Sequence, residues 1–267
     1  MLSPNVMNDK QSRNPAPDLL YFTERGAGSP LLLVHGLMMT GEMFETVIER
    51  FATRHRVIVP DLRGHGRSRG LPPPFTAEQL ASDLSRLLDH LGIGSTAMLG
   101  YSQGGAIVQQ LVLDHPTRCD RLVLACTYSY NMATFPEWLE GHLMPLLLHI
   151  LGMKGFAKLI LSQGLKNLDR ENAERGVGLI ADQDTKLMIS AWKEAVAFDS
   201  RPHLAEIKCP TLVVAASDDQ AVPFHHAKML HDGIPGSKLT IIDGADHALL
   251  WTHPDKLVHV TEEFLMD

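Results

Sequence analysis

Short apolar runs recur along the chain, and each ends in a polar or glycine-rich segment. Such runs are typical of strands that are buried on both faces of a parallel sheet, because a sheet with one wet face would show alternation instead. A weakly alternating stretch at 19–24 comes before a glycine-rich turn and is predicted to pair as a hairpin with the first run. The predicted buried strands are residues 31–34, 56–60, 95–99, 121–126, 211–215 and 238–242.

Segments with helical spacing lie between these runs. Thr76-Ala77-Glu78-Gln79 resembles a capping box, and the leucine stripe that follows it ends at Gly92. Strands that alternate with helices in this order predict a doubly wound, mostly parallel α/β sheet with helices on both faces. The other predicted helices cover residues 41–51, 106–114, 224 to about 230, and 253–264.

Residues 128–200 break this alternation. The segment contains no clear strand and is rich in Leu, Met and Trp. We expect an inserted helical cap over the carboxyl edge of the sheet, where it would exclude water from a site. A role at a membrane surface or in a dimer is the alternative for apolar helices of this kind. The predicted short helices in this segment are residues 137–150, 156–161 and 185–198.

The domain organisation follows from these elements. Residues 19–127 and 201–267 form the predicted α/β core, and 128–200 form the predicted cap between them. Residues 1–18 are polar, contain three prolines and lack the apolar stretch of a signal peptide, so a flexible tail is expected. No uninterrupted apolar run approaches the roughly 20 residues that a membrane span needs, and no span is expected.

Composition narrows the classes of partner. The chain has 267 residues, 45% of them hydrophobic, which is enough for one large domain with an insertion. A formal net charge of −7 argues against nucleic acid or an anionic membrane as a partner. Cys119, Cys126 and Cys209 match neither a disulfide framework nor a zinc site, so a reducing, cytoplasmic location is expected.

The candidate chemistry starts from Gly100-Tyr101-Ser102-Gln103-Gly104, which fits G-x-S-x-G between a predicted strand and a predicted helix. A serine hydroxyl is a poor nucleophile alone and needs a histidine base and an acid that orients it. Because ligands gather at the carboxyl ends of parallel strands, residues that follow other strands are candidates. His247 follows the last strand, and Asp218 and Asp219 follow the strand at 211–215.

Five motifs in this order make the chain resemble the α/β-hydrolase family. The resemblance implies a serine hydrolase that needs neither cofactor nor metal. It selects Asp219 over Asp218, because the family's acid stands four residues before the proline of D-x-x-V-P. The chain departs from the family at Asp246, where glycine usually precedes the histidine. The motifs are Val34-His35-Gly36, Pro60-Asp61-Leu62-Arg63-Gly64-His65-Gly66-Arg67-Ser68, the serine corner, Asp219-Gln220-Ala221-Val222-Pro223 and Ala245-Asp246-His247.

The resemblance also implies an oxyanion hole made of two backbone N–H groups. One belongs to Gln103, the residue after the serine, and the other to Leu37, the residue after the His-Gly pair. Side chains that could line a substrate pocket, or could equally belong to the core, are Met38, Met39, Trp138 and Trp251.

The remaining histidines give no metal motif. His225 and His226 are adjacent, so they are predicted to point to different sides of a helix and to lack the four-residue spacing of a zinc pair.

The predicted activity is hydrolysis of a small to medium, fairly apolar ester or lactone through an acyl-serine intermediate. The same family includes hydrolases of C–C bonds in diketone ring-cleavage products, enol-lactonases and cofactor-free haloperoxidases, and these remain alternatives. A small-molecule receptor of the same fold, which signals through its cap, is an alternative from another class. A homodimer is compatible with the sequence.

Overall fold

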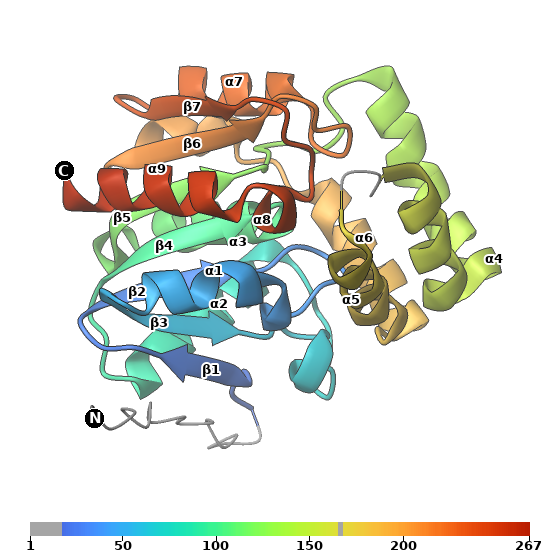
Figure 1. Cartoon of the computed structure of the whole chain (residues 1–267), viewed down its shortest axis with the longest axis horizontal. Coiled ribbons are helices and arrows are strands. Elements are labelled where there is room, and N and C mark those ends of the chain that lie inside the picture. Colours follow the sequence, from blue (N-terminus) through green and yellow to red (C-terminus); the bar gives the residue numbers. More distant parts are fainter. Residues whose placement is uncertain (1–17, 165–167) are drawn as a thin grey trace, which may run out of the picture.

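Seven strands form one sheet in the computed structural model, which describes residues 18–164 and 168–267. The spatial order is β1-β3-β2-β4-β5-β6-β7, and every neighbouring pair is parallel except β1 with β3 (Figure 1). The fold class predicted from the sequence is confirmed. The strands are β1 (Phe22–Arg25), β2 (Ser29–Val34), β3 (His55–Pro60), β4 (Thr96–Tyr101), β5 (Cys119–Ala125), β6 (Thr211–Ala216) and β7 (Lys238–Ile242).

The predicted hairpin between the first two strands is wrong. Strand β1 pairs antiparallel with β3, so that Phe22 lies opposite Pro60 and Arg25 lies opposite Val57. Both edges of β2 are already occupied, by β3 on one side and β4 on the other. The first strand therefore takes the free edge of β3.

Side chains of each central strand divide between two cores. Leu31 and Leu33 of β2 pack with apolar residues of the helices on one face, whereas Leu32 and Val34 pack on the other face. Helices α1 and α9 cover the first face, and α2 and α3 cover the second (Figure 1). The helices outside residues 128–200 are α1 (Glu45–Phe51), α2 (Ala77–His90), α3 (Gln103–Asp114), α7 (Phe224–Gly233), α8 (Leu249–Thr252) and α9 (Pro254–Met266). Short 3-10 helices lie at Gly41–Phe44, Gly66–Ser68, Pro116–Arg118 and Arg201–Glu206.

Three further helices form a separate group at the carboxyl ends of the parallel strands (Figure 1). They are α4 (Phe135–Gly164), α5 (Arg170–Ala181) and α6 (Thr185–Ala197). The first two predicted helical runs are parts of α4, which is interrupted at Gly152, where φ is 62°. The third predicted run matches α6. The predicted tail at 1–18 lies outside the described residues, apart from Asp18.

One helix has an unusual surface. By length and composition alone, residues 135–160 of α4 could cross a membrane, a test that core helices of water-soluble proteins also pass. Only 28% of its most apolar window is buried. Its exposed large apolar side chains are Phe135, Trp138, Leu139, Leu143, Leu146, Ile150 and Leu151.

Candidate active site

Ser102 occupies the corner between β4 and α3. Its backbone has φ 54° and ψ −126°, a left-handed conformation that is uncommon for a residue with a side chain. The flanking glycines permit this corner. A Cβ on Gly100 would lie 2.5 Å from the Cα of Gly105, and a Cβ on Gly104 would lie 2.1 Å from the carbonyl oxygen of Val34. The corner therefore closes only because both positions lack a side chain.

Three side chains from distant parts of the chain meet at this corner. The Oγ of Ser102 lies 3.2 Å from Nε2 of His247, and Nδ1 of His247 lies 2.8 Å from Oδ2 of Asp219. Each residue follows the carboxyl end of a parallel strand: Ser102 follows β4, Asp219 follows β6 and His247 follows β7. The imidazole is thus held between a hydroxyl and a carboxylate, the arrangement that activates a serine.

The structure distinguishes the two neighbouring aspartates. Asp219 is 4% exposed, and its Oδ1 accepts hydrogen bonds from the backbone N–H groups of Ala221 and Val222 at 2.9 and 2.8 Å. Its other oxygen is left to face His247. Asp218 is exposed and accepts a hydrogen bond from the Ser217 hydroxyl instead. Of the two aspartates, Asp219 is the one that contacts His247.

The pKa of His247 reflects opposing effects. Burial of the ring lowers it, but the Asp219 carboxylate, through its charge and its hydrogen bond, and the charge of Asp246 together raise the pKa above 6.5. Tyr101 holds the loop that carries His247, because its hydroxyl donates a hydrogen bond to the carbonyl oxygen of His247 at 2.8 Å.

Two backbone N–H groups beside Ser102 are available to a ligand. Leu37 and Gln103 donate no backbone hydrogen bond within the described parts of the chain. Gln103 is the first residue of α3, where N–H groups lack a helical acceptor. Leu37 follows Gly36, and a Cβ on Gly36 would lie 3.5 Å from Ser102 Oγ. That these two N–H groups form an oxyanion hole stays a prediction from the sequence.

Two buried histidines fix the loop that carries Leu37. His35 Nε2 accepts from the N–H of Leu62 at 2.9 Å, and His65 Nε2 accepts from the N–H of Met38 at 3.2 Å. Burial lowers the pKa of His35 to about 4 and that of His65 to about 3, so both rings remain neutral acceptors near pH 7. Their contacts are structural.

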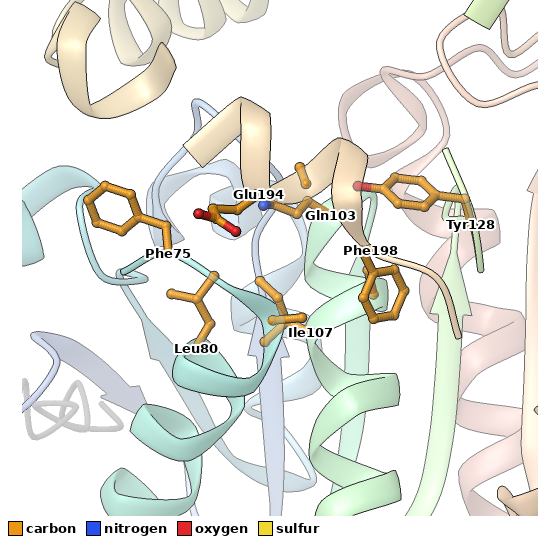
Figure 2. Close-up of a pocket in the computed structure, with 10 residues that line it drawn as sticks. Phe75, Leu80, Gln103, Ile107, Tyr128, Glu194 and Phe198 are labelled. Carbon is orange, nitrogen blue, oxygen red and sulfur yellow. The ribbon is translucent and has the colours of Figure 1, made fainter. Parts of the chain in front are cut away.

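A small pocket borders Gln103 between α3 and α6 (Figure 2). Figure 2 shows the carboxylate of Glu194 above the apolar side chains of Leu80 and Ile107, with the hydroxyl of Tyr128 to one side. The pocket thus combines an apolar lining with one carboxylate and one phenol. Its other lining residues are Phe75, Ala77, Ala106, Ala195 and Phe198.

The four side chains expected to line a substrate pocket do not border the pocket beside Gln103. Met38 and Met39 are buried in the core, and Trp251 is half-buried against Gly176. Trp138 is exposed and stacks on the exposed ring of Phe135. None of the four lines the pocket beside Gln103, and their role toward a substrate stays a prediction. The residues that border the pocket beside Gln103 come from separate segments that share no sequence motif.

Within residues 18–164 and 168–267, two sets of three donor side chains converge closely enough to hold a metal ion. One consists of Cys126, Asp219 and His247. Burial raises the pKa of the Cys126 thiol, which keeps it protonated and a poor ligand. The other set lies away from Ser102 and joins α4 to α7.

Comparison with known proteins decides the family. Residues 29–254 match the family model described as the alpha/beta hydrolase fold. The chain belongs to the α/β-hydrolase family. The serine corner, the strand order and the strand-end positions of Asp219 and His247 described above are thus features of an α/β-hydrolase.

Individual relatives of this α/β-hydrolase carry different names. A protein of Azorhizobium caulinodans, provisionally named carbamate hydrolase RutD, is 29% identical over 246 residues, which cover 88% of this chain and 91% of that protein. A thermophilic esterase from Thermogutta terrifontis is 26% identical with a TM-score of 0.84, covering 92% of this chain and 93% of that chain. Est816, described as an N-acyl homoserine lactone degrading enzyme, is 25% identical with a TM-score of 0.79, covering 92% of this chain and 96% of that chain.

Proposed function

We propose that this α/β-hydrolase is a serine hydrolase that cleaves a small to medium, fairly apolar carboxylic ester or lactone. The observation that carries the proposal is the continuous chain from Ser102 Oγ through His247 to Asp219, with contacts of 3.2 and 2.8 Å. An enzyme of the hydrolase class is what family membership and the names of its relatives support. The ester or lactone substrate is supported by the similarity to the Thermogutta esterase and to Est816.

The mechanism follows from the positions of these groups. Neutral His247 removes the proton of Ser102 as its oxygen attacks the substrate carbonyl, and Asp219 stabilises the imidazolium that forms. The N–H groups of Leu37 and Gln103 bind the negative oxygen of the tetrahedral intermediate. His247 then donates its proton to the leaving alcohol, which leaves an acyl group on Ser102. A water activated by His247 releases the acid.

The apolar character of the substrate is inferred from the pocket beside Gln103. Leu80, Ile107 and Phe198 offer an apolar surface next to one proposed oxyanion donor. Helix α6, which contributes Glu194, belongs to the helical segment 128–200, for which we propose the role of a cap. No cofactor takes part in any step of this mechanism.

The test is turnover of a panel of p-nitrophenyl acyl esters, lactones, carbamates and vinylogous diketones. We expect multiple turnovers on esters or lactones, and a loss of about 10⁴-fold or more in kcat for Ser102→Ala. A fluorophosphonate probe should label the unaltered protein at residue 102 and leave the variant unlabelled. Carbamate or diketone turnover without ester turnover would replace the proposed substrate class. A single slow turnover coupled to binding of a protein partner would favour the receptor alternative.

A further inference from the structure

Outside the serine site, three donor side chains from two distant segments converge. Glu137 lies in the first turn of α4, and His225 and His226 lie in the first turn of α7. The Oε1 atom of Glu137 is 2.9 Å from Nε2 of His225 and 3.1 Å from Nε2 of His226. The prediction that these histidines point to different sides of their helix is wrong, because their ring centroids are 4.1 Å apart and both Nε2 atoms face one oxygen.

Neighbouring groups hold these side chains in place. The second carboxylate oxygen of Glu137 accepts a hydrogen bond from the N–H of Thr134 at 2.8 Å, which leaves Oε1 facing the imidazoles. His226 is 1% exposed, and its ring meets the ring of Tyr128 edge to face. The Nε2 atom of His225 is buried without a well-aligned hydrogen bond among the described residues. A buried imidazole nitrogen that lacks a good partner is a candidate ligand atom.

We propose that Glu137, His225 and His226 bind a divalent transition-metal ion, for which Zn²⁺ is the best fit. Two imidazoles and one carboxylate form a donor set that zinc uses in sites that keep a position open, whereas Ca²⁺ and Mg²⁺ prefer oxygen ligands alone. Zinc bonds of 2.0–2.1 Å at tetrahedral angles separate donor atoms by about 3.3 Å. The three donor atoms already lie within 4.8 Å of one another, so small side-chain movements close the site.

The position of the site gives the metal a structural consequence. Glu137 belongs to the start of the segment proposed as the cap, whereas His225 and His226 follow the loop that begins at Asp219 and ends at Pro223. A bound ion ties the start of α4 to the core beside that loop. The site itself does not depend on the proposed activity, since none of its ligands touches Ser102 or His247 in any contact described above.

The test is metal binding by the full chain, without an affinity tag, after removal of metals by a chelator. Titration with Zn²⁺ followed by calorimetry should give one equivalent, and Co²⁺ should give the visible absorption bands of a low-coordinate site with nitrogen ligands. Zn²⁺ at about one hundred times its dissociation constant should raise the melting temperature by about 5 °C or more.

The variants separate this site from the donor set at the serine corner. Glu137→Gln keeps the size and polarity of the side chain, and we expect it to weaken Zn²⁺ binding at least about tenfold. The double variant His225→Ala/His226→Ala should lose binding and the absorption bands. His203→Ala is the matched control, because His203 and Glu206 form an exposed pair with 2.7 Å between Nδ1 and Oε1, and no third donor joins them among the residues that the structure describes.

His247→Ala tests the competing set that contains Cys126 and Asp219. It should retain one equivalent of Zn²⁺ with unchanged affinity. Loss of binding in His247→Ala, or retention of full affinity in Glu137→Gln and in the double variant, would overturn the proposal. So would the absence of Zn²⁺ and Co²⁺ binding in the unaltered protein. If the double variant fails to fold, Glu137→Gln decides the question alone, since it removes only the charge.

Discussion

At the scale of single residues, two adjacent aspartates provide a test of the proposed mechanism. Asp219 is buried and bonded to His247, whereas Asp218 is exposed. We expect Asp219→Asn to lower kcat by about 10⁴-fold, because an amide no longer fixes the required tautomer or stabilises the imidazolium. Asp218→Asn should keep kcat within about twofold. If kcat of Asp219→Asn fell no further than kcat of Asp218→Asn, the carboxylate of Asp219 would not be the partner that His247 needs. The measurement is steady-state hydrolysis of the best p-nitrophenyl ester.

Asp246, which replaces the usual glycine of the family, is expected to shift the pH profile. The base must be neutral, so activity falls as pH drops through the pKa of His247, which is raised above 6.5 in part by the charge of Asp246. Asp246→Asn removes that charge, lowers the pKa, and moves the acidic limb of kcat/KM toward lower pH. Asp218→Asn is the matched control and should leave the limb in place. A shift in the opposite direction would contradict the assigned electrostatics.

The sequence locates the candidate catalytic residues better than the pocket beside Gln103. Ser102, Asp219 and His247 each lie in a short motif at a strand end, so local patterns locate them. The pocket has no such signal, since Phe75 and Glu194 are brought to Gln103 only by the packing of separate elements. The same limitation explains the error at His225, whose ring direction depends on Glu137 from another helix.

At the scale of elements, α4 carries a matched pair of leucines for stability measurements. Leu148 is 0% exposed and belongs to the main core, whereas Leu146 is 57% exposed on the outer face of the same helix. Leu148→Ala should lower the free energy of unfolding by about 2–5 kcal/mol, because it leaves a cavity. Leu146→Ala should change it by less than about 0.5 kcal/mol. Urea unfolding of both variants is the measurement. A comparable loss at Leu146 would mean that this face is covered in solution.

Helix α5 shows why one element of this segment was not predicted. Its sequence contains two glycines and several charged residues, which hide the apolar spacing. The buried positions Ala173, Gly176 and Ile180 nevertheless recur at intervals of three and four. Asp169 caps the helix by accepting a hydrogen bond from the N–H of Asn172 at 2.8 Å. The cap residue and this narrow stripe are the signals that could have identified it.

At the scale of the whole molecule, the order of buried strands and intervening helices was sufficient to predict the sheet. Apolar runs such as 31–34 are local signals, and the parallel connections restrict the arrangements that they can adopt. Pairing at the sheet edge was not predictable in the same way. Strand β1 pairs with β3 because β3 has a free edge. Which edges stay free depends on how strands later in the chain pair.

The strained backbone of Ser102 lowers the stability of the whole protein while it holds the proposed nucleophile in place. A side chain held at φ 54°, ψ −126° costs about 1–3 kcal/mol, which the rest of the fold must supply. Ser102→Gly abolishes the nucleophile and also relieves that cost, whereas Ser102→Ala abolishes the nucleophile and keeps it. We therefore expect the glycine variant to melt about 3 °C or more above the alanine variant in calorimetry. Identical melting temperatures would mean that the corner is unstrained. If the difference is found, the variant that melts at the higher temperature is one that lacks the proposed nucleophile.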